Sequence, residues 1–318
     1  MIYRLLEKTI NSKIKSGKAI IILGPRQTGK TTLLEKIAGE SGDFLLIDCD
    51  DALVRNQLEN INTEGIKQIL GNNKLVFIDE AQRVKNIGLT LKIITDKFKD
   101  VQLLVSGSSS LEIASETSEP LTGRKWKYNL YPVSWAEIYN HFGHLKALQQ
   151  LETRLIFGMY PDVINNPGNE KEILKSLTGS YLYKDLLSFQ GIRKPELIEK
   201  LLKALALQMG SEVSYNELSS LLQVDKKTVS NYIDLLEKVF IIFRLQPFSR
   251  NLRSEITTSR KIYFYDTGIR NALLANFNPL SLRQDTGALW ENFLIAERMK
   301  KLHYTGTWAN CYFWRTSQ

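Results

Sequence analysis

Cysteine is scarce in this chain, and long apolar runs are missing. The 318 residues contain two cysteines, Cys49 and Cys311, which lie far apart in the sequence. Two such positions supply neither a disulfide framework nor the paired spacing of a zinc site, which predicts a reducing compartment. No run approaches the roughly eighteen apolar residues of a membrane span, and the N-terminus mixes charged with apolar residues, unlike a signal peptide. These absences predict a cytoplasmic protein without a membrane partner.

The overall charge excludes few classes of function. The formal net charge is +8, with 24% charged and 43% hydrophobic residues, which is ordinary for a globular protein. A moderate positive charge permits a nucleic-acid partner without requiring one. The length allows two or three domains.

Short apolar runs alternate with helical patterns in the first 110 residues. The segments 31–39 and 89–98 repeat apolar residues at helical spacing. The apolar runs do not alternate with polar residues, as is typical of strands buried on both faces of a parallel sheet. We therefore expect an α/β fold, with a parallel sheet that helices cover on both faces. The predicted strands are 19–23, 44–47, 75–78 and 101–105.

A glycine-rich loop follows the first predicted strand and opens a helix. It reads GPRQTGKTT, with the G-x-x-x-x-G-K-T spacing of a phosphate-binding P-loop. Glycines let backbone amides approach phosphates, Lys30 reaches the β- and γ-phosphates, and the Thr31 hydroxyl ligates Mg²⁺. We expect ATP and Mg²⁺ as ligands. The predicted nucleotide-binding residues are Gly24, Pro25, Arg26, Gln27, Thr28, Gly29, Lys30, Thr31 and Thr32.

Two consecutive carboxylates end the third predicted strand, in the sequence LVFIDEAQR. Asp79 lies where ligands bind parallel sheets, at the carboxyl edge, and is the predicted Mg²⁺-binding acid. Glu80 follows it and can act as general base on an attacking water. The alternative is a pair of solvated acids that cap a helix.

Further polar residues are weaker candidates for the same site. Ser106 and Ser108 follow the fourth strand, where a polar sensor or a plain serine-rich loop fits equally well. Arg124 is a candidate arginine finger, which would stabilise charge on the transferred phosphoryl group, and Arg83 is a lesser one. A surface arginine fits the Arg124 position equally well. Three acids after the second strand face the same edge or form a solvated turn: Asp48, Asp50 and Asp51.

The second half of the chain reads as helical, with a predicted helix-turn-helix. Ser214 and Glu217 form the pattern of a capping box for a helix at 215–222. Asp225 can cap a second helix, 226–239, whose apolar positions recur at helical spacing. Strands at 240–245 and 261–266 would make a wing.

The predicted wing is basic. The segment 241–270 has six basic residues against Glu255 and Asp266, a net charge of +4. Such a segment suits contact with DNA phosphates, although a winged helix used only for domain packing fits as well. The six residues are Arg244, Arg250, Arg253, Arg260, Lys261 and Arg270.

Several motifs together resemble a known family. GPRQTGKTT, FIDEAQ, LLVSGSSS and LTGRKWKYNLYPVSWAEI look like the archaeal-type branch of AAA+ ATPases; GMYPDVI, KIYFYDTGIRNALL and GALWENFLIAE look like the domain of unknown function that follows it. The resemblance makes Arg124 the better arginine-finger candidate, places the sensor region at Ser106 and Ser108, and favours a homo-oligomer. The C-terminal region is similar to restriction-nuclease-like folds, with Glu291 at the helical acid. We expect that region to be truncated here, because the further acidic and lysine positions of relatives are missing.

Four parts are predicted in all, and three functions stay open. The parts are an ATPase domain at 1–150, a helical connector at 151–210, a mainly helical winged-helix domain at 211–270, and a partial α/β segment at 271–318. The first function is an ATPase that drives a conformational or assembly change. The second is a nucleotide-switched DNA-binding regulator with little turnover, and the third is a P-loop kinase of small molecules. A GTPase is disfavoured because no N-K-x-D follows a late strand.

Overall fold

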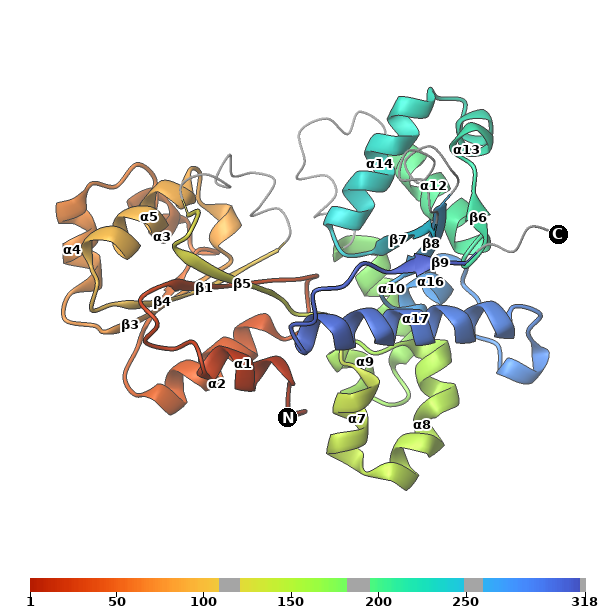
Figure 1. The fold of residues 1–318 in the computed structure, drawn as a ribbon, viewed down its shortest axis with the longest axis horizontal. Helices are drawn as coiled ribbons and strands as arrows, with labels where there is room; N and C mark the ends of the chain where they lie inside the picture. The colour runs from red at the N-terminus through yellow and green to blue at the C-terminus, as the bar shows by residue number, and fades with distance from the viewer. Residues whose placement is uncertain (109–120, 182–194, 249–259, 315–318) are drawn as a thin grey trace. The chain divides into compact units, whose positions relative to one another are not determined.

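The computed structural model describes residues 1–108, 121–181, 195–248 and 260–314, which divide into two compact units (Figure 1). The first unit comprises Met1 and Tyr3–Leu130, and the second comprises Ile2 and Tyr131–Gln318. Within the described parts of the chain, none of the helices combines the length and the hydropathy needed to cross a bilayer. The four-part division stays a prediction.

The first unit is built on a five-stranded parallel sheet in the order β2-β3-β4-β1-β5. Its three central strands are buried throughout because helices cover both faces (Figure 1). This arrangement confirms the predicted fold class. The strands are β1 Ala19–Leu23, β2 Leu45–Asp48, β3 Leu75–Asp79, β4 Gln102–Gly107 and β5 Lys125–Asn129.

Strand β5 is the one strand of this sheet that the sequence did not predict. Its residues, KWKYN, are polar in alternation and half-buried to exposed, as befits an edge strand. Residues 109–120, between β4 and β5, lie outside the described part. Pairing with β1 makes this polar segment a strand, with Ala19 opposite Lys125 and Leu23 opposite Asn129.

The two helices predicted for the first unit lie close to their predicted positions. The helix after the P-loop runs from Lys30 to Ser41, and the helix before β4 runs from Ile87 to Lys97. The former begins where Gly29 adopts a left-handed conformation with φ of 87°. In chain order the helices are α1 Leu6–Asn11, α2 Lys30–Ser41, α3 Ala52–Leu58, α4 Thr63–Leu70, the 3₁₀ turn η1 Ala81–Arg83 and α5 Ile87–Lys97.

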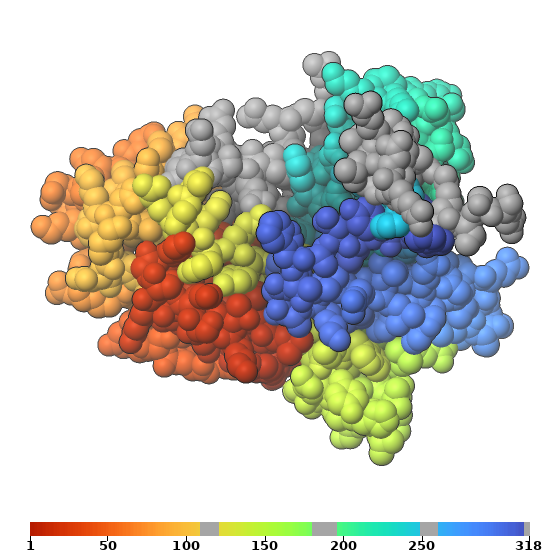
Figure 2. All heavy atoms as spheres, viewed as in Figure 1, coloured from red at the N-terminus to blue at the C-terminus, as the bar shows by residue number. Residues whose placement is uncertain are grey.

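The second unit is mainly helical, as predicted, around a small sheet in the order β6-β8-β7-β9. Strands β6 Glu212–Val213, β7 Ile242–Pro247 and β8 Arg260–Phe264 pair antiparallel, and β9 Tyr312–Phe313 pairs parallel with β7. Its helices are α7 Trp135–Phe142, α8 His144–Phe157, α9 Pro161–Asn165, α10 Glu170–Ser176, η2 Leu177–Tyr181, α12 Pro195–Leu207, α13 Tyr215–Leu222, α14 Lys226–Lys238, α16 Thr267–Leu273, η3 Leu280–Leu282 and α17 Thr286–Tyr304. The long helix α17 is drawn in blue and occupies much of the visible face of this unit (Figure 2).

Helices α13 and α14 form at the predicted positions, but the capping box at Ser214 is only half made. The Ser214 hydroxyl accepts the backbone N–H of Glu217, whereas the Glu217 carboxylate accepts from the Gln208 amide at 3.2 Å. Asp225 caps α14 as expected, accepting the N–H of Thr228. Gln208, which follows helix α12, therefore binds the side chain that the local sequence assigned to the cap.

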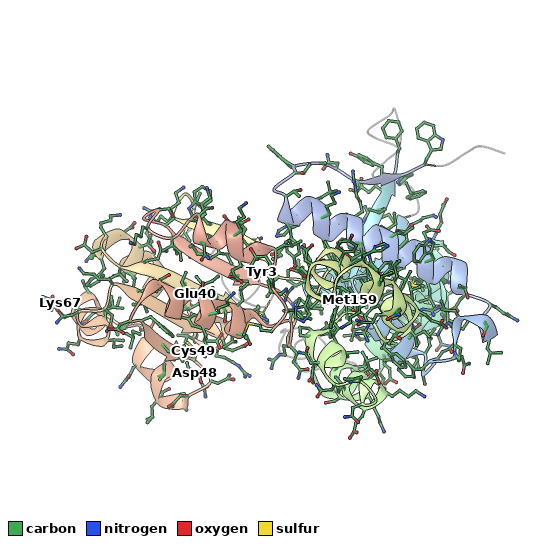
Figure 3. The ribbon with its side chains drawn as sticks, turned by 90° about the horizontal axis from the view of Figure 1, so that it is seen from below. Tyr3, Glu40, Asp48, Cys49, Lys67 and Met159 are labelled. Atoms are coloured by element: carbon green, nitrogen blue, oxygen red, sulfur yellow. The ribbon has the colours of Figure 1, made fainter. Side chains whose placement is uncertain are left out.

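The two most distinctive motifs of the second unit pack against each other. The Asp266 carboxylate accepts the N–H of Met159 at 2.7 Å and that of Ile269 at 3.1 Å. A Cβ on Gly158 would overlap this carboxylate, and one on Gly268 would overlap the carbonyl of Phe157. Burial raises the pKa of Asp266. GMYPDVI, which contains Met159 (labelled in Figure 3), and YDTG thus have a structural role in joining α8 to α16.

Candidate functional site

The P-loop lies at the carboxyl edge of the sheet, between the end of β1 and the start of α2. Gly24 is needed there because a Cβ would overlap the carbonyl oxygen of Leu130, whose own N–H donates to the Leu23 carbonyl at 2.7 Å. Gln27 has a positive φ of 60°, and Gln27 and Thr32 are exposed. The loop is thus packed against Leu130, which directly follows the edge strand β5.

Lys30 is the first residue of α2, and its side chain lies inside the loop. It is buried, and its ammonium donates to the carbonyls of Gly24 at 3.1 Å and Pro25 at 2.9 Å. The Thr28 hydroxyl also donates to the Pro25 carbonyl, at 2.9 Å. The loop therefore curls around a positive charge, and α2 points the N-terminal end of its dipole at the same place.

Asp79 ends β3 and joins the P-loop to the neighbouring strand. Its Oδ2 accepts the Thr31 hydroxyl at 2.8 Å, and its Oδ1 accepts the hydroxyl of Ser106, which is on β4. Ser106 is fully buried and in turn accepts the N–H of Glu80 at 3.1 Å. Side chains from three elements are thus brought together around one carboxylate at the carboxyl ends of the strands, where ligands bind parallel sheets.

Glu80 stands in a left-handed backbone conformation, with φ of 50° and ψ of 40°. This conformation is uncommon for a residue other than glycine and is typical of functional sites. The Glu80 carboxylate accepts a hydrogen bond from the side-chain NH₂ of Gln82. The side-chain oxygen of Gln82, Oε1, accepts the backbone N–H of Ser108 at 3.1 Å. Gln82 therefore ties the predicted base to the buried Ser108, and the sequence analysis did not single it out.

Three acids lie in the turn at the end of β2, beside this site: Asp48, the last residue of the strand, and then Asp50 and Asp51. Asp51 caps α3 by accepting the N–H of Leu53 at 2.7 Å, and Asp48 accepts the N–H of Asp50 at 2.8 Å. Asp48 and Cys49 lie together where β2 ends (Figure 3). Burial, and then the charges of nearby aspartates, raise the pKa of the Cys49 thiol to about 12. The solvated-turn alternative describes these acids, and Arg83 belongs to the turn through its contact with Asp50 at 3.1 Å.

Comparison with known proteins finds one family-model match in each half of the chain. Residues 16–139 match the model of an AAA domain. We call residues 16–139 the AAA domain after this match. Residues 148–280 match a domain of unknown function, DUF8612. The resemblance to AAA+ ATPases followed by a domain of unknown function is confirmed.

Two sequence relatives have no functional name, and one solved structure shares the fold. An uncharacterized protein of Haemophilus influenzae is 23% identical over 272 residues, covering 79% of this chain and 68% of its own length. The uncharacterized protein MJ1637 of Methanocaldococcus jannaschii is 24% identical over 318 residues, covering 85% and 66%. This chain therefore spans about two thirds of their length. The Walker-type ATPase PABY2304 of Pyrococcus abyssi shares the fold, with a TM-score of 0.58, 15% identity, and 86% of this chain and 96% of that chain covered.

Arg124 of the AAA domain lies at the amino ends of the strands, whereas the P-loop lies at their carboxyl ends. It immediately precedes β5, and its carbonyl accepts the N–H of Ala19 at the start of β1. The four steps from Ala19 to Leu23 place it about 13 Å or more from the loop of its own chain. Its guanidinium donates to Asp96 at 2.6 Å, and this hydrogen bond lowers the pKa of Asp96. Arg124 is thus not part of the cluster around Asp79.

The basic residues of the predicted wing do not form one free surface. Arg270 lies in helix α16, is 3% exposed and is bound to Asp285 and the Ala206 carbonyl. Arg244 is paired with Glu237 and Asp234. The expectation that both contribute to a basic wing is therefore wrong, because burial and acidic partners engage them. Arg250, Arg253 and Glu255 lie outside the described residues.

Glu291, on α17, is held by two residues of β8. The Tyr263 hydroxyl donates to it at 2.6 Å and the Lys261 ammonium at 3.1 Å. Partial burial works to raise the pKa of Glu291, but these hydrogen bonds lower it on balance. In the described residues no three His, Cys, Asp or Glu side chains converge as a metal-binding group.

Proposed function

We propose that the AAA domain binds Mg-ATP and hydrolyses it, and that hydrolysis drives a conformational or assembly change. The contact between Thr31 and Asp79 carries this proposal. It joins the hydroxyl that follows the P-loop lysine to a carboxylate at the end of the next strand but one. A hydroxyl and a carboxylate are oxygen ligands that suit Mg²⁺ and leave its other positions to phosphate and water.

Each residue of the cluster then has a part in binding or hydrolysis. The amides of the P-loop and the Lys30 ammonium would hold the phosphates, while Thr31 and Asp79 would hold Mg²⁺. The metal, when bound, offsets negative charge on the β- and γ-phosphates. Glu80 would take a proton from the attacking water. Ser106 fixes the orientation of Asp79 and of the Glu80 backbone, and the Gln82 side chain connects Glu80 to Ser108.

Calorimetric titration with Mg-ATP tests the binding step. Lys30→Ala should abolish tight binding because it removes the ammonium inside the loop. Lys97→Ala is a matched control, since it removes an equal charge from an exposed position at the end of α5. Wild-type affinity in Lys30→Ala, or equal loss in both variants, would contradict the proposal. Phosphate release without a phosphorylated acceptor would separate the ATPase from a small-molecule kinase.

A second candidate function is a nucleotide-switched regulator that binds DNA with little turnover. Helix α14 favours it. Its apolar residues Val229, Ile233 and Leu236 are buried in the core of the second unit, while its other face is exposed and basic. That exposed face carries Lys226, Lys227, Asn231 and Lys238. The second helix of a helix-turn-helix presents such residues to the major groove.

Fluorescence anisotropy with duplex DNA across a salt series tests this candidate. Lys226→Ala combined with Lys227→Ala should weaken binding and reduce the slope of log affinity against log salt by about 2. Exposed Lys301→Ala, on α17, is a control of the same type. Absence of binding at low salt would instead support a packing role for α13 and α14. ATP turnover with and without duplex would show whether the two functions are coupled.

A further inference from the structure

An arginine from outside the P-loop motif is bonded to the loop. Arg4 precedes α1 and is buried, with 6% of its surface exposed. Its Nη1 donates to the carbonyl oxygen of Thr28 at 2.6 Å. The same nitrogen lies 3.8 Å from the place where Gly29 would carry a Cβ. The guanidinium therefore lies against the Thr28–Gly29 peptide, directly before Lys30.

The N-terminal segment is anchored so that Arg4 stays at this position. Glu7, on α1, binds Lys36, on α2, at 2.7 Å, and the N–H of Glu7 donates to the Arg4 carbonyl at 3.0 Å. The Lys36 ammonium also lies 5.7 Å from the centre of the Tyr3 ring and 3.7 Å from Glu40. Tyr3 and Glu40 mark the two anchored elements in Figure 3. Helix α1 is thus fastened to the helix that begins at the P-loop.

The geometry of a peptide bond gives this contact a consequence for the loop. The described chain contains no cis peptide, so the C=O of Thr28 and the N–H of Gly29 point in opposite directions. Because Arg4 holds the carbonyl, the Gly29 N–H is directed to the other side of the loop. A charged donor on a carbonyl also polarises the peptide, which makes its N–H a stronger donor.

We propose that Arg4 is a positioning residue for the nucleotide phosphates. It fixes the Thr28–Gly29 peptide so that the Gly29 N–H donates to a phosphate oxygen. This inference rests on the proposed binding of Mg-ATP. Arg4 acts through the loop backbone, so its loss should affect nucleotide affinity and not the proton transfer assigned to Glu80.

Calorimetry with Mg-ATP and with Mg-ADP tests the assignment on the full chain. Arg4→Ala should bind both nucleotides about tenfold or more weakly, the scale of one charge-assisted hydrogen bond. Arg4→Lys, which keeps a charged donor, should recover part of the loss. In turnover assays KM should rise for Arg4→Ala while kcat at saturating ATP stays within about twofold, as expected for lost binding that is equal in ground and transition states.

A variant of the other anchor separates positioning from simple support of the fold. Glu7→Gln weakens the fastening of α1 to α2 but keeps the Arg4 guanidinium, so it should lower the melting temperature and reduce nucleotide affinity much less than Arg4→Ala does. Arg4→Ala with wild-type affinity, or Glu7→Gln with an equal loss of affinity, would overturn the inference. If Arg4→Ala does not fold, Arg4→Lys and Arg4→Gln take its place, and equal affinity in both would overturn it too. If the wild-type chain binds no ATP, the proposed function itself is wrong. If the wild type binds ATP, Lys30→Ala does not, and Arg4→Ala binds with wild-type affinity, only this inference is wrong.

Discussion

The Thr31 hydroxyl donates to the Asp79 carboxylate at 2.8 Å across 48 positions of the sequence. Thr31 is in the helix after β1, and Asp79 is the last residue of β3. These two strands are not neighbours, because β4 lies between them. The side chains of Thr31 and Asp79 meet beyond the carboxyl edge of the sheet, and Ser106 from the intervening strand binds the same carboxylate. The contact therefore joins three strands at the place where the P-loop opens.

Replacement of Thr31 by valine should reduce ATP affinity only when Mg²⁺ is present. Valine keeps the shape of threonine but has no hydroxyl to ligate the ion or to bind Asp79. We expect a loss of about tenfold or more in Mg²⁺, near 1.4 kcal/mol per factor of ten, and little change in EDTA. Thr31→Ser, which keeps the hydroxyl, is the control. Equal losses with and without Mg²⁺ would assign Thr31 to the loop structure alone.

Glu80→Gln should keep ATP binding and lose hydrolysis. The amide preserves the size of the side chain but cannot take a proton from water, so turnover should fall by about a hundredfold or more. Phosphate release measured beside calorimetric affinity gives both quantities. Undiminished turnover would mean that the carboxylate serves only to bind Gln82.

Gln82→Leu should lower turnover less than Glu80→Gln does, by about tenfold on the scale of a lost orienting hydrogen bond. Leucine removes both the donor to Glu80 and the acceptor for the N–H of Ser108. The affinity for ATP should stay near that of the wild type, because Gln82 does not belong to the P-loop. Gln27→Leu is a poor control because Gln27 belongs to the P-loop. Gln149→Leu, on α8, is a better control. A rise in turnover would show instead that Gln82 restrains the base.

Arg124 can act as an arginine finger only on a neighbouring copy of the chain, since it lies at the opposite edge of its own sheet. We expect turnover per chain to rise with protein concentration, and Arg124→Ala to lower turnover without changing ATP affinity. Mixing Arg124→Ala with Glu80→Gln should restore activity, because some composite sites are intact. Asp96→Asn controls for loss of the ion pair. Co-assembly without recovery would leave Arg124 a structural residue.

Cys49 should resist thiol reagents in the native protein, while Cys311 reacts. Burial raises the pKa of Cys49 to about 12, so at pH 8 only about one in ten thousand Cys49 side chains is a thiolate. Cys311 is half-buried and serves as the internal reference. Because the folded pKa exceeds the unfolded one, stability linked to Cys49 is complete below about pH 8.5 and is lost as pH rises toward 12. Fast labelling of both thiols at pH 8 would contradict the burial of Cys49, and Cys49→Ala should remove its part of the alkaline loss.

Much of the AAA domain could be predicted because its signals are local. Apolar runs, interrupted only by Gln102 in β4, predicted the strands β1, β3 and β4 that are buried on both faces. The loop residues follow from phosphate chemistry at fixed spacing. The cap at Asp225 is local in the same way. Strand β5 was missed because an edge strand can be polar and acquires its structure by pairing with β1.

The sequence by itself determined that a lysine and a threonine would open a helix beneath a glycine-rich loop, and that two acids would end a nearby strand. Only the tertiary structure decided which distant side chains serve that loop. Arg4 reaches Thr28 across 24 positions, and Gln82 reaches Ser108 across 26. The parallel pairing of β5 with β1, which only the tertiary structure shows, also places Arg124 at the amino ends of the strands. The physical reason is that local pattern fixes backbone conformation, whereas side-chain partners depend on strand order and packing, which no local pattern contains.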